Sequence, residues 1–210
     1  MPDPINAFIN QLAKTAVPPH VYNPYSPEQP LNTNRRHNLT RYLHQMQPRH
    51  PHTLLIAEAP GYRGCRLTGI PFSSPHILEQ GLDDVDLYGT QRGYRPIAEW
   101  PHIQREASAT IVWETLRQYK KLPLLWNAFP FHPHHPGQPQ SNRPPKTSEL
   151  ALGQPFVEAL LTLFPIRTVI AVGNKAETAL SQWGLDFLVK VRHPSQGGKR
   201  QFQAGLAAIL

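Results

Sequence analysis

The sequence predicts an α/β protein, a three-layer α/β/α sandwich with a mainly parallel central sheet. Three observations support this fold class. Four short apolar runs have the length and composition of buried strands, and segments with helical spacing alternate with them. Glycine or polar residues follow each run directly, as they do at the ligand-binding edge of open α/β sheets.

The first part of the chain is predicted to be an arm followed by a helix. Residues 1–33 are expected to form an N-terminal arm, with a short helix around Ile5–Ala16 and then a proline-rich crossing. Residues 34–210 are expected to form a single domain. Its first helix is predicted to begin at Asn34, a good N-cap residue, and to reach Gln47.

The first strand and a long connection come next. The first predicted strand is Thr53–Glu58. Pro75 suits the first turn of a short helix that Gly81 ends. Residues 82–104 have no clear period, so we expect a loop-rich insertion there. A helix over Glu106–Lys120 is predicted to follow.

Strands and helices continue to alternate through the second half of the chain. The predicted strands are Leu124–Trp126, ending at Asn127, then Thr168–Val172 and Phe187–Val191. The predicted helices cover residues 147–164, 174–184 and 199–209, and a loop rich in proline and histidine covers residues 129–146.

Length, charge and cysteine content limit the classes of protein. The 210 residues suffice for one α/β domain with a buried core. The net charge of +7 favours a polyanionic partner such as nucleic acid. The single cysteine, Cys65, excludes a disulfide framework or a four-thiolate cluster within one chain. We find no signal-peptide pattern or long apolar span, so we expect a cytoplasmic monomer with no membrane partner.

Short motifs follow the predicted strands. They are Glu58-Ala59-Pro60-Gly61, Gly69-Ile70-Pro71-Phe72, Asn127, Asn142-Arg143-Pro144-Pro145, Val169-Ile170-Ala171-Val172-Gly173 and His193-Pro194-Ser195. In this order they resemble the motifs of the uracil-DNA glycosylase superfamily, most closely those of its thermophile-type, iron-sulfur branch. The resemblance spans residues 54–200 and implies a uracil-DNA glycosylase-like fold.

This resemblance implies a pocket for a base that is flipped out of DNA. Phe72 would stack on the base through its flat aromatic face. The amide of Asn127 can accept from uracil N3–H and donate to O4, whereas cytosine presents the opposite pattern. His193 would donate to O2 and stabilise the anion that forms when the glycosidic bond breaks.

Other residues complete the expected site. Glu58, or a backbone carbonyl, would orient the attacking water. Backbone N–H groups near Ala59, with the turn at Gly61, would hold the base or the water. Three residues of the last loop and helix suit contacts with the flanking DNA phosphates: Ser195, Lys199 and Arg200.

The chain departs from the family pattern at four places. Ala59 stands where several branches have an aspartate or asparagine that positions water. Cys65 alone cannot ligate the iron-sulfur cluster, and no cofactor or metal is expected. Gly61 stands where the best-known branch has a tyrosine that blocks a C5 methyl group, so it leaves space there. The loop over residues 196–200 lacks an apolar wedge, which favours single-stranded or mismatched DNA.

Each site residue also has a structural alternative. Glu58 could simply bond nearby backbone N–H groups, and Phe72 could belong to the core. Asn127 could cap the turn after its strand, and His193 could support its loop. Cys65 is expected to be a bystander rather than a nucleophile.

Three further groups of residues have both a functional and a structural interpretation. His132, His134 and His135 are expected in a solvated loop rather than at a zinc ion, because no fourth ligand is evident. Arg35 and Arg36 are expected on a solvated helix face. The aromatic residues Tyr88, Tyr94 and Trp100, with Arg92 and Arg95, suit either single-strand binding or packing within the insertion.

The sequence thus predicts a monofunctional DNA glycosylase that hydrolyses the N-glycosidic bond of uracil or a related deaminated base. One alternative is a catalytically weak or inactive protein of the same fold that binds DNA or a free base. Another is an enzyme of free nucleosides, which would need no basic surface.

Overall fold

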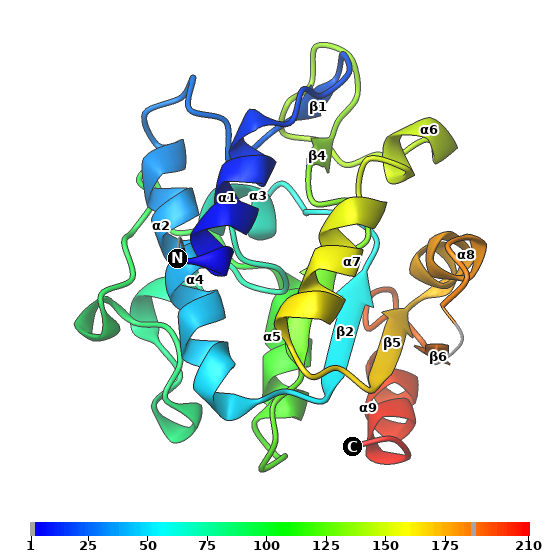
Figure 1. Ribbon diagram of the computed structural model, residues 1–210. Helices are drawn as coiled ribbons and strands as arrows, with labels where there is room; N and C mark the ends of the chain where they lie inside the picture. Colours follow the sequence, from blue (N-terminus) through cyan, green and yellow to red (C-terminus); the bar gives the residue numbers. More distant parts are fainter. Residues whose placement is uncertain (1–2, 186–187) are drawn as a thin grey trace.

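A four-stranded parallel sheet forms the centre of the computed structural model, which describes residues 3–185 and 188–210 (Figure 1). The strands are β2 (Thr53–Ala57), β3 (Leu124–Asn127), β5 (Thr168–Val172) and β6 (Leu188–Val191). Their order is β3-β2-β5-β6, and every neighbouring pair is parallel. The predicted fold class is therefore confirmed. The predicted first residue of the last strand, Phe187, lies outside the described residues.

Helices surround this sheet. The longer helices are α1 (Pro4–Lys14), α2 (Asn32–Met46), α4 (Pro75–Gln80), α5 (Ala107–Leu116), α7 (Gln154–Leu163), α8 (Asn174–Gln182) and α9 (Lys199–Ala207). Single turns are α3 (Cys65–Thr68), α6 (Thr147–Leu150), η1 (Gln47–Arg49), η2 (Asp83–Val85) and η3 (Thr90–Arg92), and β1 (Val21–Tyr22) pairs with β4 (His132–Pro133) in an antiparallel ribbon.

Both faces of the sheet are covered. Successive strand residues point to opposite faces, yet all four residues of β3 and four of the five in β2 and in β5 are buried. On one face Trp126 of β3 contacts Phe8 of α1, and Phe8 contacts Phe156 of α7, with ring centroids 5.4 and 5.8 Å apart. Figure 1 shows α7 crossing in front of the sheet. Part of the N-terminal segment thus belongs to the hydrophobic core.

The open edge of β3 is closed by a side chain. The backbone N–H of Leu125 donates to the hydroxyl of Tyr42, at 2.9 Å. Tyr42 is fully buried and comes from α2. Helix α2 therefore covers this edge of the sheet.

Several predicted helix boundaries were wrong. The helices predicted to reach Ala16 and Lys120 end at Lys14 and Leu116. Helix α2 begins at Asn32 with Leu31 as its N-cap, because a hydrogen-bonded turn over residues 29–32 leads straight into it. Asn34 lies inside the first turn and donates to the Pro96 carbonyl instead. The segment 147–164 is not one helix but α6 and α7. They separate at Gly153, where an added Cβ would lie 1.8 Å from a backbone oxygen of Ala128.

The insertion over residues 82–104 is loop-rich, as predicted, with two single turns. Its aromatic residues mostly join the core. Tyr88 is fully buried and contacts Trp113 and Tyr94, with centroids 5.3 and 5.4 Å apart. Trp100 is partly exposed, 6.0 Å from the ring of Tyr62. For the two tyrosines, packing is thus the observed role.

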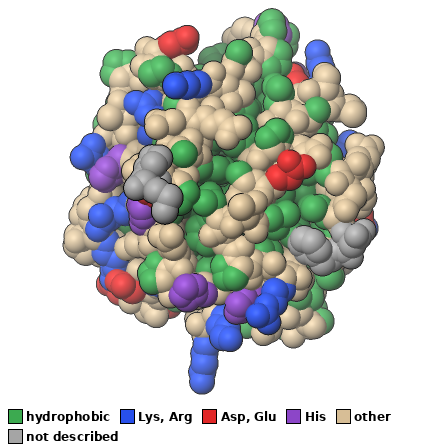
Figure 2. All heavy atoms as spheres, in the orientation of Figure 1, with side chains coloured by type: hydrophobic (Ala, Val, Ile, Leu, Met, Phe, Trp, Pro, Cys, Tyr) green, Lys and Arg blue, Asp and Glu red, His purple; other side chains and the backbone are tan. Residues whose placement is uncertain are grey.

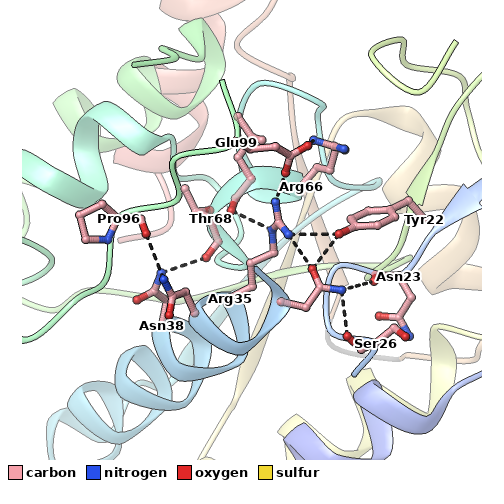
Figure 3. Close-up of polar contacts among 12 residues, drawn as sticks. Tyr22, Asn23, Ser26, Arg35, Asn38, Arg66, Thr68, Pro96 and Glu99 are labelled. Carbon is pink, nitrogen blue, oxygen red and sulfur yellow. Dashed lines mark hydrogen bonds and ion pairs between the residues drawn. The ribbon is translucent and has the colours of Figure 1, made fainter. Parts of the chain in front are cut away.

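The predicted solvated position of Arg35 was wrong, since its side chain is 1% exposed. It lies in a buried polar network between α2, α3 and the insertion (Figure 3). Its guanidinium pairs with Glu99 and donates to Asn32 Oδ1 at 2.6 Å and to the Leu67 carbonyl at 3.0 Å. Leu67 and Glu99 lie 32 and 64 residues from Arg35, so no local pattern signalled the burial.

The network fixes one end of the insertion. Arg66 of α3 also pairs with Glu99, at 2.7 Å, and stacks over the ring of Tyr22. Tyr22 in turn donates to Asn32, at 2.7 Å. Two buried arginines therefore hold the carboxylate of Glu99. Glu106, the N-cap residue of α5, lies seven residues further along the chain.

Candidate active site

An open pocket of about 800 Å³ lies at the carboxyl ends of the strands. In Figure 1 the arrowheads of β2 and β5 point toward this end of the sheet. Seven of the predicted site residues line it: Glu58, Ala59, Gly61, Phe72, Asn127, His193 and Ser195. The strand-end loops thus bring together residues up to 137 positions apart (195 − 58).

Glu58 and Ala59 both line the pocket because β2 ends at Ala57 rather than at Glu58. The strict alternation of strand faces no longer applies beyond that residue. Glu58 is partly exposed, and burial raises the pKa of its carboxyl above its usual value, with Lys175 acting in the opposite direction. A carboxyl group therefore borders the pocket beside an alanine.

Phe72 and Asn127 contribute an aromatic ring and an amide. Phe72 has a φ of 53°, a left-handed conformation uncommon for a bulky residue, and its carbonyl accepts from the Trp113 indole at 2.9 Å. Backbone strain of this kind is concentrated at binding sites. Asn127 is buried, and its amide donates to the sulfur of Cys65 at 3.5 Å.

The His193 loop fixes the tautomer of its imidazole. The backbone N–H of Ser195 donates to Nδ1 of His193 at 3.1 Å, and the Ser195 hydroxyl lies 2.7 Å from the same nitrogen. Because a backbone N–H can only donate, Nδ1 is the acceptor and the proton of the neutral ring is on Nε2. Burial, and then Arg192, lower the pKa of His193. The ring is therefore a neutral donor at pH 7.

The predicted phosphate contacts have different surroundings. Ser195 lines the pocket and bonds His193. Lys199 and Arg200 begin α9, and both are exposed. Lys199 pairs with Glu114 of α5 at 2.7 Å, so part of its charge is already balanced. Their contacts with DNA stay predictions.

Positive charge also comes from the pocket itself. Arg143, Lys175 and Arg192 are among the residues that line it. Figure 2 shows other Lys and Arg side chains spaced around the rim of one face of the molecule, with hydrophobic side chains nearer its centre. A pocket lined by cations suits an anionic ligand.

The loop rich in proline and histidine holds the loop after β2. His132 donates from Nδ1 to the carbonyl of Pro60 at 2.8 Å, and the amide oxygen of Asn142 accepts from the backbone N–H of Tyr62 at 3.0 Å. Arg143 pairs with the buried carboxylate of Glu149 at 2.7 Å. Side chains that follow β3 thus position the first motif.

The prediction that His132 lies in a solvated loop was wrong, because its side chain is fully buried. His135 is exposed, as predicted. The antiparallel pairing of Tyr22 with His132 draws this part of the loop inward. Across residues 3–185 and 188–210, no three His, Cys, Asp or Glu side chains gather closely enough to hold a metal ion. No helix in the same residues is long and apolar enough to cross a membrane.

Sequence reasoning missed Glu106. This residue occupies the N-cap position of α5 without a capping hydrogen bond from its side chain, and it lines the pocket. Burial raises the pKa of its carboxyl to about 7. A Cβ added to Gly61 would lie 2.3 Å from its Oε1, and one added to Gly64 would lie 2.0 Å from its Oε2. The space that Gly61 leaves is therefore taken by a carboxyl group. No motif marked this glutamate, since it follows a segment without a period.

Comparison with known proteins identifies the family. The sequence model of the Uracil DNA glycosylase superfamily matches residues 43–207, which is more than half of the chain. This chain belongs to the uracil-DNA glycosylase superfamily. Membership supports a DNA glycosylase function in general terms, with DNA as the substrate.

One solved structure has the same fold as this chain. The crystal structure of wild-type SMUG2 from Pedobacter heparinus superposes with a TM-score of 0.68 at 17% sequence identity. The match covers 99% of this chain and 97% of the other. No curated protein matches the sequence. At this identity the structural match supports the fold, and the family model supports the class of activity.

Proposed function

We propose that this chain is a monofunctional DNA glycosylase that hydrolyses the N-glycosidic bond of uracil or a related deaminated base in DNA. The observation that carries the proposal is the fixed tautomer of His193, a neutral Nε2–H donor in the same pocket as Asn127 and Phe72. A donor of this kind suits an oxygen on which negative charge develops.

The reaction assigns a step to each group. Phe72 stacks on the flipped base, and Asn127 binds its N3 and O4 edge. The bond between the sugar C1′ and the base nitrogen breaks, and its electron pair stays on the base. Nε2–H of His193 stabilises the resulting anion at O2. Water adds to C1′, oriented by Glu58 or a backbone carbonyl, and loses a proton to solvent.

The surroundings of the pocket favour a particular form of DNA. Gln196 and Gly197 both have positive φ angles, 51° and 78°, and are exposed. This tight polar turn suits phosphate contacts better than insertion into a base stack. We therefore propose single-stranded or mismatched DNA as the preferred substrate. The expected cytoplasmic location and monomeric state remain predictions.

One observation favours the second candidate, a weak or inactive protein of this fold that binds DNA or a free base. Ala59 offers no polar side chain to water at its position in the pocket. Glu58 and Glu106 are the carboxyl groups among the pocket-lining residues that would have to replace it. Activity on DNA decides between the candidates.

The deciding experiment is a cleavage assay on labelled oligonucleotides. Each carries one uracil, hypoxanthine or mismatched thymine in single-stranded or duplex form, and abasic sites are detected by alkaline strand cleavage. We expect excision of uracil by the wild type and loss of excision in Asn127→Ala, with Asn10→Ala on the exposed face of α1 as control. Tight, salt-sensitive binding without cleavage of any base would favour the second candidate.

A further inference from the structure

The carboxyl group of Glu106 occupies a position that only glycine neighbours allow. Its two oxygens lie where the Cβ atoms of residues 61 and 64 would be, at 2.3 and 2.0 Å from those positions. Gly61 has no positive φ, so its backbone does not require glycine. Gly64 differs, because its φ of −119° and ψ of −111° lie outside the usual regions and an added Cβ would also lie 2.7 Å from the carbonyl oxygen of Ser73. At Gly61, where only Glu106 atoms lie near the added Cβ, room for the carboxyl group is what the glycine provides.

This carboxyl group lies on the same wall of the pocket as Asn127. Cys65 follows Gly64 directly and accepts a hydrogen bond from the Asn127 amide at 3.5 Å. The charge of Glu106 also contributes to the raised pKa of the Cys65 thiol, after burial. We call Gly61, Gly64, Cys65, Glu106 and Asn127 the recognition wall.

Glu106 has no structural partner in the described part of the chain. Its carboxylate takes part in none of the hydrogen bonds or ion pairs formed within residues 3–185 and 188–210, although its backbone carbonyl accepts from Thr110. Other buried or half-buried carboxylates here, such as Glu99 and Glu149, are held by arginines. A polar group that borders a pocket without a partner is free to bind a ligand.

The protonation state decides what such a group binds. An ionised carboxylate only accepts, and so favours amino groups, whereas a protonated carboxyl group also donates to a carbonyl oxygen. Deamination replaces the exocyclic amino group of a base with a carbonyl oxygen. Burial favours the protonated form of Glu106 near pH 7.

We propose that Glu106 is a specificity-determining residue that donates from its protonated carboxyl group to the exocyclic carbonyl oxygen of a flipped, deaminated base. This proposal rests on the glycosylase function proposed above. The class of ligand is a uracil- or hypoxanthine-like base, and cytosine or adenine presents an amino group at the same place. Asn127 then accepts from N3–H of uracil, and the two lone pairs of O4 accept from the Asn127 amide and from Glu106.

The pH dependence follows from this role. Excision needs protonated Glu106, so its rate is highest below a pH of about 7 and falls as the pH rises further. A group that activates water would give the opposite slope, because it must be ionised. The single-turnover rate against pH therefore separates the two roles.

Other titratable or charged groups also face the pocket. On the loops after β2 and β6, burial raises the pKa of the Glu58 carboxyl and lowers the pKa of the His193 imidazole, and Glu106→Gln leaves both groups in place. On α3, burial keeps the Cys65 thiol protonated well above pH 7. The remaining cations are Lys175 on α8, Arg192 after β6 and Arg143 after β4.

The test compares the wild type with Glu106→Gln, Glu106→Ala and Gly61→Ala on uracil and hypoxanthine oligonucleotides between pH 5.5 and 8.5. We expect the wild-type rate to fall about tenfold per pH unit above 7. Glu106→Gln keeps an N–H donor and loses this slope. Glu106→Ala and Gly61→Ala, whose new Cβ displaces the carboxyl group, are expected to lose about tenfold at pH 6. Glu158→Gln on the exposed face of α7 is the control, and circular dichroism checks folding.

Two results would overturn the inference. One is a wild-type rate that rises through pH 7 and is abolished in Glu106→Gln, which assigns Glu106 to water activation. The other is an unchanged slope in Glu106→Gln. If the wild type cleaves nothing, the proposed function fails. The ratio of its affinities for uracil and cytosine oligonucleotides then still tests whether Glu106 recognises the base. Loss of that ratio in Glu106→Ala supports recognition, and an unchanged ratio refutes it.

Discussion

The two sides of the pocket are built in different ways. One side consists of the loops after β2, β3 and β6, and the sheet backbone fixes where each loop starts. The other side is Glu106, which meets the first side at Gly61 and ends a segment that side chains of α2 and α3 hold at Glu99. We therefore expect the first side to tolerate more substitutions outside the pocket than the second side, whose position depends on two buried arginines.

The largest effect is expected from Arg35→Met, which removes one of the two arginines that pair with Glu99 and the guanidinium donor to Asn32. Removing one partner of a buried pair costs about 3–5 kcal/mol of unfolding free energy. Urea unfolding measures this loss, with the exposed Arg167→Met expected to change it by less than about 0.5 kcal/mol. Equal, small losses in both variants would contradict the idea that Arg35 holds the second side.

On the strand side, His193→Ala is expected to slow excision about 100- to 1000-fold, because it removes the donor to the developing anion. Stability should change little, since the ring is partly exposed. Single-turnover rates on a uracil oligonucleotide check this. Ser195→Ala keeps the backbone N–H that fixes the tautomer and should lose much less. Equal losses in the two variants would show that the hydroxyl is what matters.

The next prediction concerns Glu58, whose expected pH dependence is opposite to that of Glu106. Glu58→Gln is expected to cost about 1.5–3 kcal/mol of activation free energy, the worth of a hydrogen bond to a charged group. The raised pKa of Glu58 means that excision falls as the pH drops through it, since the ionised form orients water. A pH–rate profile measured below pH 6 tests this, and Glu58→Gln should lack the fall. An unchanged profile would assign the water to a backbone carbonyl.

The smallest effect is expected at the start of α9. Arg200→Ala should lower the slope of log affinity against log salt concentration by about 0.9 if Arg200 contacts one phosphate. Lys199→Ala should change the slope less, because Glu114 already balances Lys199. Fluorescence anisotropy at several salt concentrations gives both slopes. A larger change for Lys199 would mean that DNA displaces Glu114.

The sequence predicted the strand side of the pocket because its signals are local. An apolar run followed by a polar loop marks Glu58 and Asn127, and parallel strands bring such loops to one edge. The four strands were predicted for the same reason. The boundary errors at Asn34 and Gly153 arose where a preceding turn or a nearby backbone oxygen overrode local propensity.

The second side could not be predicted from local patterns. Arg35 and Glu99 are 64 residues apart, and neither the burial of Arg35 nor its pairing has a signature in sequence spacing. Glu106 follows a segment without a period, and its position over Gly61 depends on how the insertion folds back. A glycine in place of a larger residue in a pocket motif is a signal that another side chain can fill the space.

The hydroxyl of Tyr42 has a consequence for self-association. An unpaired edge strand is a template on which other chains can add, and aggregation often begins there. Because Tyr42 bonds Leu125 and α2 covers β3, the described sheet is closed to such growth on that side. At the opposite edge, the exposed β6 carries Lys190, paired with Glu177 at 2.8 Å. A charged side chain on that strand opposes edge-to-edge stacking, so both ends of the sheet disfavour polymerisation.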